Sequence, residues 1–468
     1  MGFFVRVVLL LVSSISLANA ALRATVTVDP SLASAVVELS ANDAIPTLTA
    51  SSSAATALLS KLTSCDNAPA VVATTTGRRA TLLADVRCVR YFTSLPELTG
   101  RRGLSDAASS VARLTDPRHW LLTGAERFAD IDIDFRIPPD TVVSAPWQSR
   151  GASGFRRVGG GDRSGTPVVV FGRFAQSRLT TPLGTLRIAY LGTQDSATHN
   201  KLQQWLRASA ANVATQFERL IVNDVQVLLF DAASDRVKSP VPFGMVTRTE
   251  APAVRFYVDP QRSLADLNDD WTATHELAHL VMPRIRERWI GEGFATYLQN
   301  VLMASGGAWS EDRVWREMTA GFARGRAARP ELSPAETAGQ SGSRMKVYWA
   351  GAALALAADV ELRARTANKR SLPAVLASYA QANDNRASAS AGTFLAALDA
   401  ELDAPLFVPL LEAIATEPGF PDTESILERL GVRVTGESVS YERDAELASI
   451  RPELWQRRLT GRSPQPES

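Results

Sequence analysis

Histidine and cysteine are scarce in this chain of 468 residues, which has four histidines and two cysteines. Two cysteines allow one intramolecular disulfide, and they exclude a small fold held together by several of them. The small number of histidines likewise limits how many histidine ligands a metal site can have. His119 and His199 lie far upstream of His275 and His279, so a site built on the later pair must take further ligands from other residue types.

A strong excess of charge is also lacking. Lys and Arg total 50, Asp and Glu total 49, and the formal net charge is +1. Arg6 is the only charged residue within positions 1–20, so the net charge falls from +1 to 0 when that segment is removed. This balance argues against nucleic acid and against an anionic membrane surface as partners, because both are bound by basic patches.

Long hydrophobic runs are confined to the N-terminus. Residues 1–20 contain one Arg, an apolar run over Val7–Val12 and the small residues Ala18-Asn19-Ala20. Such a segment is typical of a secretory signal peptide and is too short to span a bilayer. No later stretch is long and apolar enough, so we expect a periplasmic or secreted protein with no membrane span after cleavage. In an oxidising compartment Cys65 and Cys88 are predicted to form a disulfide, and the alternative is two buried thiols.

Residues 21–183 are predicted to form a β-rich, sandwich-like N-terminal domain. Short runs rich in Val, Ile, Phe and Thr are broken by Pro, Gly and Asp, which is typical of strands separated by turns. In residues 130–135 apolar and acidic side chains alternate strictly, which predicts a half-buried antiparallel strand. The Gly-rich segment 148–167 precedes a strand rather than a helix, so it is predicted to be a mobile surface loop and not a phosphate-binding loop.

The pattern changes at about residue 184. Three strand-like runs and one helical run follow, at 184–192, 225–231 and 254–259, and at 200–217. Two helices are expected next, one that carries His275 and is stopped by Pro283, and one from about residue 292 to 304. Beyond residue 307 the chain is predicted to be almost entirely helical. The expected fold class is therefore α+β, with a signal peptide at 1–20, a β-rich domain at 21–183, a mixed domain at 184–307 and a helical region at 308–460.

One motif, His275, Glu276 and His279, has the order H-E-x-x-H. Positions i and i+4 of a helix lie on the same face, so both imidazoles can point at one Zn²⁺. Glu276 lies beside them and can take a proton from a water molecule during hydrolysis. The alternative is a polar turn on a surface helix. The motif predicts one zinc ion at a hydrolytic site.

The third zinc ligand is expected to be a carboxylate, because a catalytic zinc typically has three protein ligands and an open position. Two glutamates follow the motif closely. Glu287 lies between arginines in R-I-R-E-R-W and is predicted to be a solvated surface charge. Glu292 begins an apolar helix and is flanked by glycines that permit close approach, so it is the predicted ligand. Thr296, one turn later, either orients a ligand imidazole or packs as an ordinary helix residue.

The phrase H-E-L-A-H followed by W-I-G-E-G-F-A-T-Y resembles the gluzincin zinc metallopeptidases, in particular their aminopeptidase N-like and glycyl aminopeptidase-like families. The linker at 280–291 is shorter than in the aminopeptidase N-like pattern. The resemblance implies a thermolysin-like catalytic domain at 184–307, between a β-rich N-terminal domain and a helical C-terminal region. It also implies a peptidase with one Zn²⁺ that acts on a peptide or protein substrate and is aminopeptidase-like, and the segment 1–20 indicates that this peptidase is exported.

Two further roles are implied by this resemblance. Tyr348, in the phrase Y-W-A-G, matches a tyrosine whose hydroxyl stabilises the oxyanion, and its alternative is a core aromatic. Glu250 matches the glutamate of a G-x-M-E-N edge segment that binds the α-amine of the substrate. That phrase is altered here, since Thr247 and Thr249 stand at its Gly and Met positions, and Phe243-Gly244-Met245 lacks the acid. The alternatives are a surface glutamate and an endopeptidase specificity.

Three other functions fit parts of the sequence. A zinc-binding pseudo-enzyme or scaffold would keep the metal but would not need Glu276. A non-enzymatic surface module would use the β-rich domain and would leave the H-E-x-x-H motif unexplained. A hydrolase of non-peptide amides or esters would keep the same chemistry with a different substrate.

Overall fold

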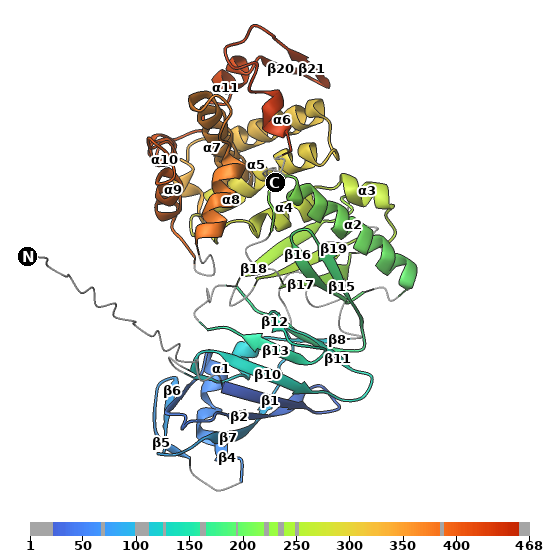
Figure 1. Cartoon of the computed structure of the whole chain (residues 1–468), viewed down its shortest axis with the longest axis vertical. Coiled ribbons are helices and arrows are strands. Elements are labelled where there is room, and N and C mark those ends of the chain that lie inside the picture. The colour runs from blue at the N-terminus through green and yellow to red at the C-terminus, as the bar shows by residue number, and fades with distance from the viewer. Residues whose placement is uncertain are drawn as a thin grey trace, which may run out of the picture.

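Figure 1 shows the computed structural model of the chain. It describes residues 22–66, 71–98, 112–124, 128–159, 165–192, 195–219, 224–232, 238–248, 252–383 and 388–457. The segment predicted to be a signal peptide lies outside these ranges. No helix of the described residues is long and apolar enough to cross a membrane.

The N-terminal half of the described chain is built from three sheets and one short helix. The sheets have the orders β12-β13-β10-β1-β2-β7-β4, β5-β6-β3-β9 and β11-β14-β8. Most of their buried side chains form one core, which the short helix also joins, whereas Ala112 and Leu114 of β8 and Val170 of β14 belong to a second cluster. The elements are β1 (Leu22–Val28), β2 (Ser34–Ser40), β3 (Thr47–Thr49), α1 (Ser53–Thr56), β4 (Thr63–Ser64), β5 (Val72–Thr76), β6 (Arg79–Leu82), β7 (Cys88–Ser94), β8 (Ala112–Thr115), β9 (Thr123–Gly124), β10 (Ile131–Arg136), β11 (Val142–Ser144), β12 (Gln148–Ser149), β13 (Gly154–Arg157) and β14 (Val169–Gly172).

Two predictions for this half need correction. Strand β10 has the expected alternation, with Ile131, Ile133 and Phe135 buried, but it pairs antiparallel with β13 only and lies parallel to β1. Alternation reports which face of a strand is buried and carries no information on the direction of its neighbour. The segment 148–167 is not simply a surface loop, because its described part contributes strands β12 and β13 to the largest sheet.

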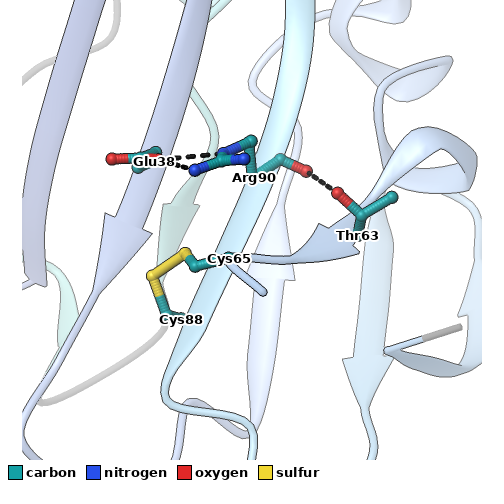
Figure 2. The surroundings of a disulfide bond; sticks show 5 residues. All are labelled: Glu38, Thr63, Cys65, Cys88 and Arg90. Atoms are coloured by element: carbon teal, nitrogen blue, oxygen red, sulfur yellow. Dashed lines mark hydrogen bonds and ion pairs between the residues drawn. A yellow bond between two sulfur atoms is a disulfide. The ribbon is translucent and has the colours of Figure 1, made fainter. Parts of the chain in front are cut away.

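Cys65 and Cys88 form a disulfide with a Cα–Cα distance of 5.6 Å, which confirms the predicted pairing (Figure 2). The bond ties the segment after β4 to the start of β7. Beside it, Arg90 of β7 donates a hydrogen bond of 2.9 Å from Nε to Glu38, and Thr63 donates one of 3.2 Å to the carbonyl oxygen of Arg90. The disulfide therefore fixes an edge of the largest sheet.

A five-stranded sheet in the order β15-β16-β17-β19-β18 lies at the centre of the described chain. Strands β16, β17 and β19 are parallel, and β15 and β18 are antiparallel edges. One face packs on helices and the other packs on strands β8 and β14, so the sheet is buried on both sides as parallel sheets usually are. The elements are β15 (Ala175–Thr181), β16 (Gly184–Tyr190), α2 (Ser196–Ala214), β17 (Asp224–Asp231), β18 (Phe243–Arg248), β19 (Pro252–Val258), α3 (Leu264–Asp269), α4 (Thr272–His279) and α5 (Arg288–Ser305).

The C-terminal part is mostly helical and lies beyond α5, at the top of Figure 1. Its elements are α6 (Glu311–Ala327), α7 (Arg344–Arg365), α8 (Leu372–Ala382), α9 (Ala391–Asp399), α10 (Phe407–Ala415), α11 (Glu424–Arg429), β20 (Val432–Thr435) and β21 (Ser438–Tyr441). The hairpin of β20 and β21 was not predicted. The chain is therefore of mixed α+β type, as the sequence indicates. Helix α5 begins at Arg288, one turn earlier than predicted, which places Glu292 within the helix.

Candidate active site

Helix α4 places His275, Glu276 and His279 against the sheet and against helix α5. The exposed fraction is 2% for His275 and 8% for Glu276. Trp271, just before the helix, contacts His275 edge to face with ring centroids 5.5 Å apart. The two imidazoles, one turn apart, have ring centroids separated by 4.8 Å. The helix therefore presents two histidine side chains on one buried face, as the spacing of the motif requires.

Glu292 of α5 completes a group of three potential metal ligands. Its Oε2 lies 3.5 Å from Nε2 of His275 and 3.4 Å from Nε2 of His279. The three ligand atoms all lie within 4.8 Å of one another. Among the described residues, no other group of three or more His, Cys, Asp or Glu side chains is arranged in this way. Tetrahedral ligands at zinc distances of about 2.1 Å are separated by roughly 3.4 Å, so the donor types and their spacing fit zinc.

Gln299 fixes the orientation of His275. Its Oε1 lies 3.1 Å from Nδ1 of His275, on the side of the ring away from Glu292. An acceptor at Nδ1 holds the proton there and leaves Nε2 free to bind a metal. Gln299 lies two turns after Glu292 on the same face of α5, a spacing of seven that the sequence displays. Thr296, considered for this role, instead donates a hydrogen bond of 2.8 Å to the backbone oxygen of Glu292.

Burial and close contact set the protonation of the three groups. Burial acts to raise the pKa of Glu292, but hydrogen bonds with the two histidines outweigh it and hold that pKa well below its ordinary value. Burial lowers the pKa of His279 to about 4, so this imidazole is neutral at pH 7. Burial also acts to lower the pKa of His275, but the hydrogen bond with Glu292 leaves it above the ordinary value. An ionised carboxylate beside a neutral imidazole is the state that binds a metal cation.

Glu276 is packed against strand β18 at Gly244. Burial raises the pKa of this carboxyl to about 7, although the charge of His275 and a hydrogen bond from the backbone of Val246 act to lower it. A Cβ atom added to Gly244 would lie 2.6 Å from Cγ of Glu276 and 2.9 Å from Cγ2 of Thr272. Glycine is therefore required at position 244 so that the edge strand can pass the carboxylate.

Replacing Gly244 with Ala is expected to displace Glu276 and to lower kcat by about 10²-fold, because a shift of roughly 1 Å in a catalytic group has that effect. The matched control is Gly392→Ala in α9, where an added Cβ meets nothing within 4 Å. The measurement compares kcat, zinc content and the thermal unfolding midpoint of both variants. Retention of full activity by Gly244→Ala would show that the strand does not position Glu276.

Helix α7 reaches the site because it crosses α5 at two glycines. A Cβ on Gly293 would lie 2.3 Å from Cα of Gly351, and a Cβ on Gly351 would lie 2.0 Å from the backbone oxygen of Trp289. This contact brings Tyr348, one turn before Gly351, next to His275, with ring centroids 6.0 Å apart. The phrases G-E-G and Y-x-x-G are thus the two sides of one helix crossing.

The phenol of Tyr348 is half-buried and protonated at neutral pH. Burial raises its pKa to about 12, and the charge of Glu292 acts in the same direction. Arg288, at the start of α5, has its Nε 3.4 Å from Oε1 of Glu292, and its charge acts to lower the pKa of Tyr348. A protonated hydroxyl at this position can donate a hydrogen bond to a developing negative charge.

The structure describes Glu287 but not Glu250, so only the prediction for Glu287 can be compared with it. Glu287 is exposed, as predicted, but its carboxylate accepts a hydrogen bond of 2.6 Å from the backbone N–H of Ala391. Glu287 thus accepts a hydrogen bond from a backbone N–H group in the first turn of α9, and it is not one of the three potential metal ligands. Glu250 lies outside the described residues, so its assignment to the substrate amine stays a prediction. The adjacent strand β18 and its Gly244 lie beside helix α4.

Replacing Gln299 with Ala is expected to weaken zinc binding by about 10- to 100-fold, because the imidazole of His275 loses the group that orients it. Zinc affinity can be measured by competition with a chromogenic chelator. Gln299→Glu is the informative companion, since a carboxylate can accept the same hydrogen bond from Nδ1 and should retain zinc. Equal losses in both variants would contradict an orienting role.

Two solved structures of metallopeptidases have folds similar to that of this chain. An aminopeptidase N family protein from Idiomarina loihiensis aligns with a TM-score of 0.61 at 14% identity, over 88% of this chain and 79% of that chain. An M1 zinc metallopeptidase from Deinococcus radiodurans aligns with a TM-score of 0.50 at 15% identity, over 86% of this chain and 95% of that chain. No family model matches the sequence, and neither does any curated protein.

The fold is that of the aminopeptidase N-like gluzincins, so the resemblance carried by the zinc motif is confirmed at the level of fold. At identities of 14% and 15% the match extends over most of the chain even though the sequences have diverged widely. Activity and specificity therefore have to be argued from the residues of this chain.

Proposed function

We propose that this chain is an exported, zinc-dependent metallopeptidase that hydrolyses peptide bonds and is aminopeptidase-like. The observation that carries the proposal is the convergence of His275, His279 and Glu292, with one oxygen of the glutamate 3.5 and 3.4 Å from the two histidine nitrogens. Two histidines and one carboxylate are a typical ligand set of a catalytic zinc, which retains an open position. Export rests on the sequence of residues 1–20.

The residues around this group have the properties that hydrolysis requires. When bound, zinc lowers the pKa of a water molecule toward about 7 and polarises the scissile carbonyl. Glu276 accepts a proton from the attacking water and then delivers it to the leaving amine. Its raised pKa of about 7 suits a group that must both take and give a proton near neutral pH. Tyr348 donates a hydrogen bond to the oxygen on which negative charge develops.

A zinc-binding scaffold without catalysis explains fewer of these features. Metal binding alone needs the two histidines and Glu292. It does not need a buried Glu276 whose pKa burial raises, nor a glycine on the edge strand that makes room for it. Burying a carboxyl raises the free energy of the folded state, and a scaffold without catalysis would gain nothing that offsets this cost.

Removing the metal is expected to abolish peptide cleavage, and adding back about one equivalent of zinc should restore it. The measurement is the rate of cleavage of a mixed peptide set, with free and acetylated N-termini, before and after treatment with a chelator. The same set shows whether the protein is an aminopeptidase, which requires the free amine, or an endopeptidase. Cleavage at an unchanged rate by metal-free protein would contradict the proposal.

A further inference from the structure

Trp271, immediately before helix α4, is an exposed indole beside a potential metal ligand. Its side chain is 39% exposed, although its ring lies edge to face with that of His275 at a centroid distance of 5.5 Å. Residues 272–278 of α4 are all buried, and His279 is half-buried. Trp271 is therefore the one exposed side chain of residues 271–279.

The other exposed large apolar side chains of the described residues lie elsewhere. They are Leu83, Phe92, Phe243 and Met245. The first two belong to the N-terminal half. Phe243 and Met245 flank Gly244 on β18, and because a Cβ on Gly244 would point at Glu276, its neighbours point to the opposite face of the strand. Trp271, by contrast, belongs to the α4 side of β18, where Glu276 lies.

Hydrogen bonds hold the backbone around Trp271 in place. The carbonyl oxygen of Trp271 accepts a hydrogen bond of 3.0 Å from the N–H of His275. The carboxylate of Asp270 accepts one of 2.8 Å from the N–H of Thr272 and one of 2.8 Å from the hydroxyl of Ser239. The residues on both sides of Trp271 are thus fixed, so little ordering of its backbone is needed when a substrate binds.

The proposed chemistry determines which part of a substrate lies at this helix. Glu276 delivers its proton to the leaving amine, so the substrate residue that carries this amine lies against α4. An exposed indole beside that residue offers it an apolar surface. An apolar side chain gains free energy by leaving water for such a surface, and an aromatic one gains more through ring packing. A charged side chain would lose hydration there without a partner.

We propose, on the basis of the proposed peptidase function, that Trp271 is a specificity-determining residue. It binds a large apolar side chain, above all an aromatic one, of the substrate residue that follows the cleaved bond. Glu250, which the family resemblance assigns to a free α-amine, would concern the residue before that bond, so the two assignments can be tested separately.

The test uses alanine hexapeptides that carry one Phe at each position in turn, with all-alanine hexapeptide as the reference and with free or acetylated N-termini. Mass spectrometry of the products locates the cleaved bond. For the zinc-loaded wild type we expect kcat/KM to be higher by about 10- to 100-fold when Phe follows the cleaved bond than when Ala does. A wild type without this preference, or with a preference only for the residue before the bond, overturns the proposal.

Trp271→Ala should bring the rate on the Phe peptide close to that on the all-alanine peptide. Trp271→Gln should do the same, because it keeps bulk beside His275 but offers a polar surface, whereas Trp271→Phe should keep most of the preference. Since the ratio of two peptides is measured on one preparation, a general loss of activity caused by a shift of His275 cancels. The matched control is Phe92→Ala, which removes an exposed aromatic ring from β7 and should retain the preference. A preference that survives in Trp271→Ala or Trp271→Gln contradicts the assignment.

Hydroxamates separate this inference from the peptidase proposal, because they bind zinc without being cleaved. Two succinyl hydroxamates, with a benzyl or a methyl group on the carbon that mimics the residue after the cleaved bond, are compared by calorimetry. The zinc-loaded wild type should bind the benzyl compound about 10- to 100-fold more tightly, and Trp271→Ala should remove the difference. If the wild type cleaves no peptide, the peptidase proposal fails, but this difference still supports the role of Trp271. Equal binding of the two compounds by the wild type overturns that role.

Discussion

Replacing Glu276 with Gln is expected to lower kcat by about 10²–10⁴-fold, the range that general acid–base catalysis contributes. Gln has nearly the same shape, so it fits beside Gly244 and leaves the three potential zinc ligands in place. It cannot accept a proton from the attacking water, and it cannot return one to the leaving amine. The measurement is kcat on a cleaved peptide, together with the zinc content of the same preparation.

The zinc content of the variant distinguishes a loss of catalysis from a loss of the metal. An inactive Glu276→Gln protein that still holds zinc places Glu276 in the chemistry and not in the folding of the site. Glu276→Asp is the companion variant, because it keeps the acid but withdraws it by one methylene, and it should retain part of the activity. Turnover near that of the wild type in Glu276→Gln would mean that another group acts as the base.

The local part of the site could be predicted from sequence because helix geometry is fixed. His275 and His279 lie one turn apart in any α-helix, so their shared face follows from their spacing alone. Glu292 required a further inference, that a carboxylate flanked by glycines approaches another helix closely. The structure gives the reason, since Gly293 lies where α7 crosses α5.

The parts that sequence did not reveal depend on contacts between distant segments. Gln299 is an ordinary polar residue until α4 and α5 pack together and bring it 3.1 Å from His275. Gly244 was considered only as part of a phrase that lacks an acid, yet its missing side chain makes room for Glu276. Neither of these roles has a local pattern, because each is defined by the register of an edge strand or the packing of two helices.

The same limit applies to the sheets. The alternation in residues 130–135 correctly indicated a half-buried strand, since burial of one face is a local property. The pairing of β10 with β1, from the other end of the N-terminal half, could not be read in this way. Strand β18, at the edge of the central sheet, pairs with β19 over Phe243–Arg248, and this pairing too has no local pattern in the sequence.

Replacing His279 or Glu292 with Ala is expected to remove zinc and, with it, nearly all activity. A catalytic zinc needs three protein ligands, and two leave it too weakly held to survive purification. Glu287→Ala is the matched control, because it removes a glutamate from the same linker and helix start. Its carboxylate bonds to the backbone of Ala391, so this variant should keep its zinc and lose only about 1 kcal/mol of stability from the end of α9.

Metal analysis of the three purified variants, beside the wild type, decides the assignment. The wild type and Glu287→Ala should each contain about one zinc per chain, and the two ligand variants should contain almost none. Thermal unfolding with and without added zinc gives a second readout, since zinc stabilises only a protein that binds it. A zinc-free Glu287→Ala beside a zinc-loaded Glu292→Ala would move the third ligand to Glu287. That result would contradict the convergence of Glu292 with the two histidine nitrogens at 3.5 and 3.4 Å, on which the proposed function depends.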